Sequence, residues 1–360
     1  MIPQMEPYIT ETTAKALSEY VKDGGWLTEH TKTRHFEELL KEFTGAKHCF
    51  ITPNGTLSLS LALKALGIGP GDEVIVPAYT MLASASAIDF IGAKSIFCDI
   101  EPDTLCMEVE SVEEKITPKT KAIMYVSING RTARSFDELK ERVGERIPIV
   151  EDAAQALGST HKGKHVGLHG NVGSLSFSAP KIITTGQGGA LITNDDALAR
   201  SIKRMRDFGR DTPGRDEYTS LGWNLKFSDL QAIVGIEQMQ DINWRVARKK
   251  EMWNIYEGEL SHIPEVSLIP TSNEVAPWFY DILIDDRERL MEYLLKEGIS
   301  TRKFYPLLIR QGAYFEDYGV EEYPVAEEVA TKGLWLPSSL KLTDEQIYFI
   351  CSKISQYYGR

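Results

Sequence analysis

The chain has 360 residues, a length that suits about two domains. Hydrophobic residues make up 42% and charged residues 26%, which excludes a disordered or collagen-like chain. The net charge of −12 and the lack of a basic stretch argue against a nucleic-acid partner.

The four cysteines are scattered and include no Cys-x-x-Cys pair, which is typical of a reducing compartment rather than a disulfide scaffold. The start of the chain lacks the basic-then-apolar pattern of a signal peptide. No apolar run approaches the roughly 20 residues that span a bilayer. We therefore expect a cytoplasmic protein with no membrane partner.

Short apolar runs alternate with helical patterns through the first two thirds of the chain. The runs predict strands at 73–77, 95–99, 122–128, 147–150, 174–178 and 190–193, and the helical patterns lie at 56–66, 84–91 and 135–143. The strands are apolar on both faces, as in a sheet covered by helices on each side. This alternation predicts an α/β fold with a mostly parallel central sheet flanked by helices.

The pattern changes near residue 243. After this point we expect a long helix at 244–260, a strand at 278–284 and a helix at 287–297. Earlier in the chain, a Gly- and Lys-rich stretch at 162–173 predicts a hairpin or loop. The sequence therefore predicts a large α/β domain over 1–242 and a smaller C-terminal α+β domain over 243–360.

The common nucleotide, zinc-protease and serine-hydrolase motifs are absent, so the sheet must serve another chemistry. The run 147–152 ends in two carboxylates, Glu151 and Asp152, and residues at the carboxyl ends of parallel strands face the ligand crevice. Asp152 is therefore a candidate site residue. The alternative is an ordinary helix N-cap before the Ala-Ala-Gln sequence.

Lys181 follows another predicted strand and precedes a Gly-rich turn. A lysine in such a place is commonly a solvated charge. The surrounding small hydroxyl residues, proline and glycines indicate a tightly packed backbone, where loss of solvent lowers the pKa of the amine and makes it nucleophilic.

Asn54, Gly55 and Thr56 connect an apolar strand to a leucine-rich helix. Free backbone N–H groups and the positive helix N-terminus there can bind an anion, although these residue types are also plain turn and cap residues. An anion site, a strand-end acid and a strand-end lysine together suit one cofactor, pyridoxal 5′-phosphate (PLP).

At this point the chain resembles the sugar aminotransferases of the DegT/StrS type, which are fold-type I PLP enzymes. The similarity runs over nearly the whole chain. It is carried by ordered matches at 25–28, 54–56, 71–77, 151–155, 176–177, Lys181, 184–186, 188–189, Asn224, 228–231, 323–327 and 336–337.

The resemblance implies a role for each matching position. Lys181 would hold PLP as a Schiff base and move protons, and Asp152 would pair with the pyridinium nitrogen. Gln155 would contact the 3′-oxygen of the ring. Phosphate contacts would come from Gly55, Thr56 and Ser176, with Asn54 beside them, and from Asn224 and Lys226 of a neighbouring subunit in a homodimer with shared sites. The alternative for Asn224 is a helix cap. No metal is implied.

The chain also departs from the family pattern. Met81 stands where relatives have an aromatic residue stacking on the PLP ring, and methionine is polarisable enough to lie against a ring. Tyr79 either helps or belongs to the core. The segment 127–131 replaces a loop that lies near the substrate in relatives, and Gln187 replaces a common glutamate, an exchange for which we have no physical account.

The resemblance predicts transfer of an amino group from L-glutamate to a keto sugar nucleotide. The segment 302–306 resembles relatives that aminate carbon 4 of 4-keto-6-deoxy hexoses, and the nearest rival is amination at carbon 3. Sugar dehydratases of this type carry histidine in place of Lys181. A non-catalytic regulatory protein with the same fold is the remaining alternative, and the presence of Lys181, Asp152 and Gln155 argues against it.

Overall fold

The computed structural model describes residues 1–212 and 214–360. Seven strands form its central sheet: β1 (His48–Thr52), β2 (Glu73–Pro77), β3 (Lys94–Cys98), β4 (Thr120–Val126), β5 (Ile149–Asp152), β8 (Val172–Ser176) and β9 (Gly189–Thr193). Their order is β1-β9-β8-β5-β4-β2-β3. Only β9 runs against the others, because it pairs antiparallel with both of its neighbours. The predicted mostly parallel sheet is confirmed.

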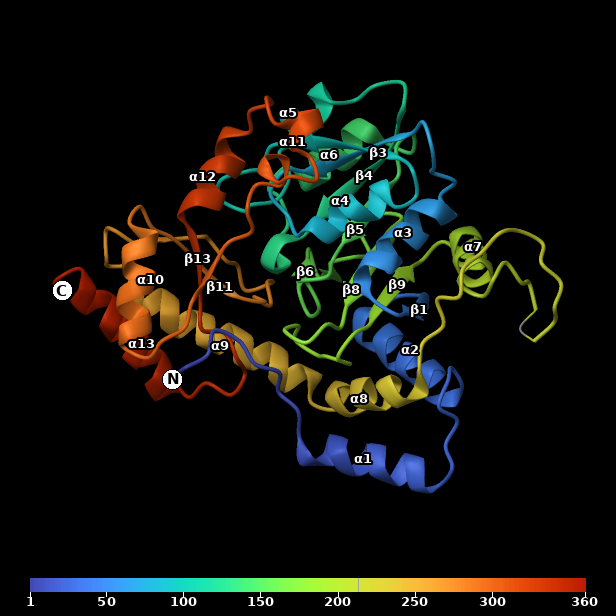
Figure 1. The fold of residues 1–360 in the computed structure, drawn as a ribbon, viewed down its shortest axis with the longest axis horizontal. Coiled ribbons are helices and arrows are strands. Elements are labelled where there is room, and N and C mark those ends of the chain that lie inside the picture. Colours follow the sequence, from blue (N-terminus) through green and yellow to red (C-terminus); the bar gives the residue numbers. More distant parts are fainter. Residues whose placement is uncertain (213) are drawn as a thin grey trace.

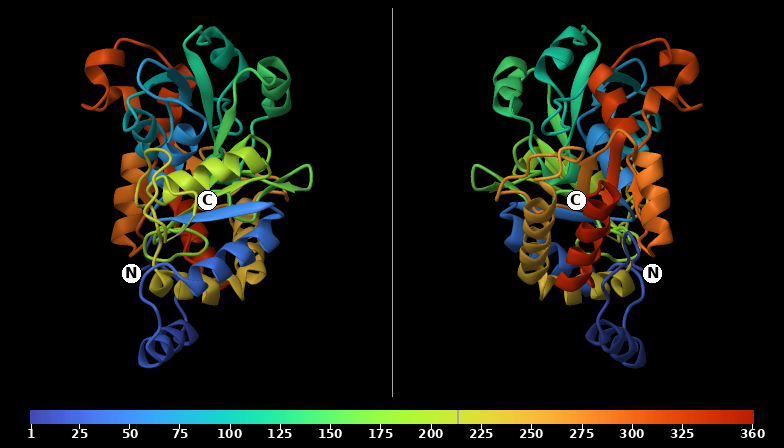
Figure 2. Two further views of the ribbon diagram at one scale, coloured as in Figure 1. Left: turned by 90° about the vertical axis from the view of Figure 1, so that its right-hand side faces the viewer. Right: turned by 90° about the vertical axis from the view of Figure 1, so that its left-hand side faces the viewer.

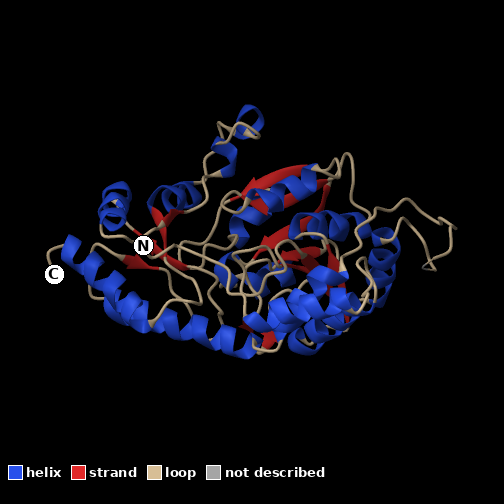
Figure 3. Ribbon diagram, turned by 60° about the horizontal axis from the view of Figure 1, so that its bottom comes forward, coloured by secondary structure: helices blue, strands red, loops and turns tan. Residues whose placement is uncertain are grey.

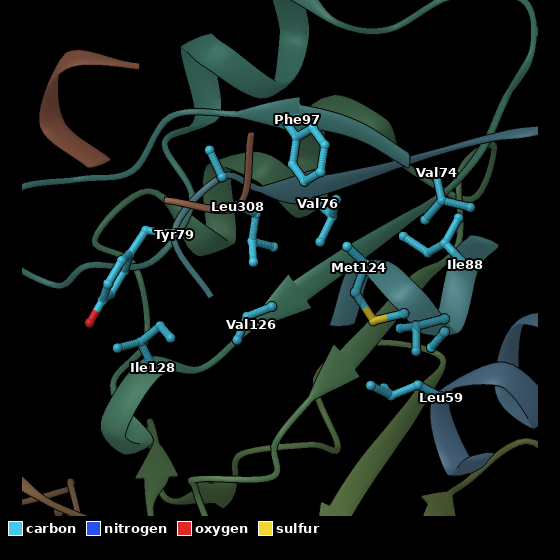
Figure 4. Packing of buried hydrophobic residues seen from close by; sticks show 14 of the residues in the cluster. Leu59, Val74, Val76, Tyr79, Ile88, Phe97, Met124, Val126, Ile128 and Leu308 are labelled. Atoms are coloured by element: carbon cyan, nitrogen blue, oxygen red, sulfur yellow. The ribbon is translucent and has the colours of Figure 1, made fainter. Parts of the chain in front are cut away.

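Helices cover both faces of this sheet (Figures 1 and 3). They are α2 (Thr31–Thr44), α3 (Gly55–Ala65), α4 (Leu82–Asp89), α5 (Val109–Glu114), α6 (Phe136–Val143), α7 (Asp196–Arg206) and α8 (Asp229–Met239). Alternate residues of one strand enter different cores: Val74 and Val76 pack with α3 and α4, whereas Ile75 packs with α5 and α6. Figure 4 shows the first of these cores. Burial on both faces explains why the strands carry no polar alternation.

Several strands end differently from the prediction, β5 and β4 among them; β8, for example, ends at Ser176 rather than at residue 178. β5 continues through Asp152, whose neighbours in the sheet are Val126 and Ser174. β4 stops at Val126 because the chain then turns through η1 (Ile128–Gly130), where Asn129 has a φ of 52°. The predicted hairpin is present as β6 (Thr160–His161) and β7 (Lys164–His165), followed by a loop to β8.

A second sheet is antiparallel and contains β10 (Ser267–Leu268), β11 (Tyr280–Leu283), β13 (Gly333–Leu336) and β12 (Arg302–Lys303), in that order. Its apolar side chains pack with α9 (Ile242–Leu260), α10 (Arg287–Lys296) and α13 (Asp344–Tyr357). Both termini lie at this end of the molecule (Figure 1), while α1 (Glu11–Lys22) lies beside α8 at the edge of the body (Figure 2).

The C-terminal segment also returns to the first sheet. It contains η2 (Leu308–Arg310), α11 (Phe315–Tyr318) and α12 (Pro324–Lys332). The hydroxyl of Tyr318 donates to the carbonyl of Ser95 at 2.6 Å, and Tyr323 donates to the carbonyl of Phe97 at 3.1 Å. Residues after 243 thus cover the β3 edge of the first sheet, and the domain division at 242/243 stays a prediction. Within the described residues, no helix is both long and apolar enough to cross a bilayer.

Candidate active site

The carboxyl ends of the parallel strands bring the predicted residues to one edge of the sheet. Gly189, the first residue of the reversed strand β9, pairs with Thr52 on one side and with Ser176 on the other. Asp152 ends β5, the next strand after β8. The sheet therefore places the start of α3, Ser176 and Asp152 along a single edge, as expected for a ligand crevice.

Asp152 is buried and held by two hydrogen bonds. The Ser84 hydroxyl of α4 donates to its Oδ2 at 2.7 Å, and the Ala154 N–H donates to Oδ1 at 3.2 Å. Burial raises the pKa of this carboxyl, while Ser84, Ala154 and the charge of Lys181 oppose that rise. Turns rather than a helix follow Asp152, so its interpretation as a helix N-cap is wrong.

Lys181 lies in the turn after β8, where its N–H donates to the Ser178 carbonyl at 3.0 Å. Its amine lies 3.7 Å from the centre of the Trp278 ring, and the Trp278 indole donates to the Pro180 carbonyl at 2.6 Å. Enclosure of the amine lowers the pKa of Lys181 to about 7, with Asp152 opposing the shift and Arg302 adding to it. A lysine with such a pKa is not an ordinary solvated charge.

The chain after Lys181 is held by α8. Gln238 is buried, and its amide accepts from the Thr184 N–H at 3.0 Å and donates to the Thr184 carbonyl at 2.6 Å. Gln231 donates to the Gln187 carbonyl at 2.7 Å. These contacts fix both ends of the Gly-rich turn, so the position of Lys181 is determined by residues distant in sequence.

The N-terminus of α3 faces the same edge. Asn54 caps this helix, accepting from the Leu57 N–H at 2.9 Å, so the cap interpretation of its side chain is correct. Gly55 packs so closely on Ser176 that an added Cβ would lie 3.2 Å from the Ser176 Cβ. The amides of Gly55 and Thr56 precede the first hydrogen bond within the helix, which leaves them available to an anion.

Gln155 is buried, and its side-chain oxygen accepts from the Asn129 N–H at 2.7 Å. The Asn129 amide in turn exchanges two 2.7 Å hydrogen bonds with the backbone of Phe279 and donates to Asp281. Arg131 and Asp281 form a buried ion pair at 2.5 Å. The unusual segment 127–131 therefore joins the first sheet to β11.

Met81 precedes α4 and is 46% exposed, with its sulfur 3.0 Å from the Ala83 N–H. Tyr79 is fully buried against Phe304 and Tyr305. Its hydroxyl has no hydrogen-bond partner among the described residues. Tyr79 thus contributes to the core, and whether Met81 reaches a cofactor ring stays a prediction.

Asn224 is exposed and lines a cavity of about 480 Å³ that also includes Pro53 and Lys226. Lys226 pairs with Asp207 at 3.1 Å. The cap of α8 is Ser228, whose hydroxyl accepts from the Leu230 N–H, so the interpretation of Asn224 as a helix cap is wrong.

Sequence reasoning missed Ser84, Gln238 and Trp278. Each of these side chains lies far along the chain from the site segment that it contacts. Trp278 was expected only as the start of a strand, yet it lies before β11 and against Lys181. No local pattern marks such contacts.

The site has unused polar groups that fit PLP. The Asp152 carboxylate accepts two hydrogen bonds, about half of what its oxygens can take. Within the described chain, the Lys181 amine forms no hydrogen bond and no ion pair within 4 Å, although Asp152 is near enough to act on its charge. A buried acid, a free amine and a helix N-terminus match the three recognition needs of this cofactor.

Comparison with known proteins identifies the family of the chain. The model of the DegT/DnrJ/EryC1/StrS aminotransferase family matches residues 7–355. The GDP-perosamine synthase of Escherichia coli O157:H7 is 33% identical over 363 residues, which cover 99% of each chain. The UDP-2-acetamido-2-deoxy-3-oxo-D-glucuronate aminotransferase of Pseudomonas aeruginosa is 33% identical over 323 residues, 89% of each chain.

A solved structure of S. venezuelae DesV in complex with a ketimine intermediate superposes with a TM-score of 0.91 at 28% identity and covers 99% of each chain. The chain belongs to the DegT/DnrJ/EryC1/StrS aminotransferase family, and it is a PLP-dependent sugar aminotransferase.

Proposed function

We propose that this enzyme transfers an amino group from L-glutamate to carbon 4 of a nucleotide-linked 4-keto-6-deoxy hexose. The product would be an amino sugar for a surface polysaccharide or a glycosylated product. One observation carries the catalytic part of the proposal: the Lys181 amine is enclosed against the Trp278 ring, within the electrostatic reach of the buried Asp152 carboxylate, and this enclosure lowers its pKa to about 7.

When bound, PLP supplies an aldehyde that exchanges amines and a ring that accepts electrons. Lys181 would hold the aldehyde through its amine and would then act as acid and base, removing a proton from the carbon that loses nitrogen and adding one to the carbon that gains it. Asp152, kept in place by Ser84, would keep a proton on the ring nitrogen. Gly55, Thr56 and Ser176 would bind the phosphate, with Asn54 shaping the helix N-terminus.

Gln155 and Met81 would contact the cofactor ring, the former at its 3′-oxygen. Gln155 accepts from Asn129 through its side-chain oxygen, so its amide nitrogen can donate to the cofactor, and Met81 is half-exposed at the start of α4. Absorbance spectra of Gln155→Ala and Met81→Ala loaded with PLP would reveal contact with the ring, because either loss should shift the cofactor band.

The catalytic role of Lys181 is tested by reducing its covalent link to PLP with borohydride. Borohydride treatment of the PLP-loaded enzyme should place the adduct on Lys181, as mapped by mass spectrometry. Lys181→Ala should bind PLP without a covalent link and lose turnover, whereas Lys164→Ala, on the exposed hairpin, should behave as wild type. An adduct on another lysine would overturn the assignment.

The position of amination is tested with two substrates. The resemblance of the segment 302–306 to carbon 4 enzymes supports carbon 4, and the relative from Pseudomonas aeruginosa, named for a 3-oxo sugar, keeps carbon 3 as the alternative. Purified enzyme with L-glutamate should aminate a GDP-linked 4-keto-6-deoxy hexose and not a UDP-linked 3-keto sugar. NMR of the product identifies the carbon that carries nitrogen.

The proposal includes a homodimer with shared sites. Two large exposed apolar side chains lie near Asn224: Leu27 lines the same cavity, and Phe90 packs against Trp223, the residue before Asn224. Exposed apolar clusters of this kind mark interfaces. Sedimentation of the PLP-loaded enzyme should show a dimer, and an active monomer would withdraw the role of Asn224 across subunits.

The proposed location is the cytoplasm. All four cysteines are free and buried, as expected of a protein that works in a reducing compartment.

A further inference from the structure

An aromatic cluster of Trp278, Phe279, Phe304, Tyr305 and Trp335 forms part of the surroundings of Lys181. Its rings are in mutual contact, with centre-to-centre distances of 6.0 Å between Trp278 and Trp335 and 4.8 Å between Tyr305 and Trp335. The cluster bridges β12, β13 and the segment before β11. It therefore links the second sheet to the lysine of the first domain.

Two cations rest on this cluster. The Lys181 amine lies on Trp278, and the guanidinium carbon of Arg302 lies 5.4 Å from the Trp335 ring centre and 5.9 Å from that of Tyr305. The charge of Arg302 lowers the pKa of Lys181 and acts on that of Tyr305, which also responds to Asp152. Arg302 thus belongs electrostatically to the same site.

Arg302 differs from its neighbour on β12 in its partners. Lys303 pairs with Glu288 at 2.6 Å, whereas no acid lies within 4 Å of Arg302 in the described chain. The Arg302 side chain is exposed, so its guanidinium is open to a ligand, and it is linked to Lys181 through the contact between the Trp335 and Trp278 rings. Its charge disfavours the ammonium form of Lys181, and an anionic ligand bound to Arg302 would offset that effect.

We propose that Arg302 binds the oxyanion of a substrate, a carboxylate or a phosphate, beside Lys181. The guanidinium is planar and matches either group with two parallel hydrogen bonds. This inference rests on the proposed function, in which the amino donor brings carboxylates and the sugar nucleotide brings a diphosphate. In this arrangement, Arg302 of the second sheet recognises the negative charge of the substrate, and Lys181, which follows a strand of the first sheet, carries out the amino transfer.

The test measures binding of unreactive probes to the PLP-loaded enzyme by calorimetry. Glutarate represents the carboxylates of the donor, and GDP represents the diphosphate. The variant is Arg302→Gln, and the matched control is Lys303→Gln, the adjacent exposed cation on the same strand. We expect Arg302→Gln to raise the Kd of one probe at least tenfold and Lys303→Gln to stay within twofold of wild type.

The probe that is weakened identifies the source of the oxyanion. Unchanged affinity of Arg302→Gln for both probes, or no binding of either probe to wild type, would overturn the proposal. If Arg302→Gln does not fold, Arg302→Lys keeps the charge but loses the planar fork, and should weaken the same probe at least threefold. Failure of wild type to convert its cofactor with L-glutamate would refute the proposed function while leaving these binding results valid.

Discussion

The amine of Lys181 lies over the ring of Trp278, 3.7 Å from its centre, and the same indole donates to the carbonyl of Pro180, the residue before the lysine. Trp278 is itself fixed by Lys249, a fully buried lysine of α9 that donates to the Trp278 carbonyl at 2.7 Å and to the Ser338 carbonyl at 2.5 Å. The small sheet and α9 thereby hold the lysine of the large sheet in place.

Trp278→Phe separates the two contacts of the indole, because it keeps a ring below the amine and removes the N–H donor. We expect the free energy of unfolding to fall by about 0.5–1.5 kcal/mol, since the partly buried Pro180 carbonyl loses its hydrogen-bond partner. Turnover should fall as well, because the turn that carries Lys181 loosens. Urea denaturation and steady-state assays measure both effects.

Trp244→Phe is the matched control, because Trp244 is 44% exposed and lies on α9 against Tyr8 rather than near Lys181. Equal stability and turnover of Trp278→Phe and Trp244→Phe would show that the indole N–H has no role in holding the turn.

The reactivity of Lys181 should depend on pH with a midpoint near 7. Burial lowers the pKa of its amine to about 7, and only the neutral amine attacks an aldehyde. The rate at which PLP attaches covalently to the cofactor-free enzyme should therefore rise through pH 7 and level off above it. Stopped-flow absorbance measures this profile.

Asp152→Asn should shift the midpoint of this pH profile. The Asp152 carboxylate favours the ammonium form of Lys181, so its removal should lower the pKa of the amine further and move the midpoint below that of wild type. A midpoint near 10, the ordinary lysine value, or a shift upward in Asp152→Asn would contradict the enclosed geometry of the amine.

Ser84→Ala removes the hydroxyl donor to Asp152. The pKa of this carboxyl should rise further, because Ser84 stabilises its charged form. We expect a loss of about 1.5–3 kcal/mol in stability, typical of a hydrogen bond to a charged group, together with slower turnover. Ser86→Ala serves as the control on the same helix, since its hydroxyl bonds only the Ala83 carbonyl of its own turn.

Asp281→Ala breaks the buried ion pair between β11 and the segment 127–131. Arg131 would be left charged and buried, which costs about 3–5 kcal/mol. Thermal unfolding should report a clear loss of stability. Asp285→Ala is the control, because it removes a strongly exposed partner of Lys332 and should change stability by less than about 1 kcal/mol. An equal loss of stability in the two variants would show that the buried ion pair does not hold β11 to the segment 127–131.

Much of the first sheet was predictable from the sequence. Strands buried on both faces leave continuous apolar runs, and their direction follows from the helices between them. Because parallel strands end at one edge, the positions of Asp152, Lys181 and Asn54 after predicted strands already indicated a shared site. The exact strand ends were not predictable, as Asp152 shows, because they depend on pairing with neighbouring strands.

Only the tertiary structure decided what surrounds Lys181. Trp278, Gln238 and Ser84 reach the site from other elements, and nothing in their local sequence marks them. The sequence by itself determined the order of elements, the candidate lysine and acid, and the family. The lowered pKa of the lysine and the joint between the sheets arise from long-range packing, because the loss of solvent around a group depends on every element that folds against it.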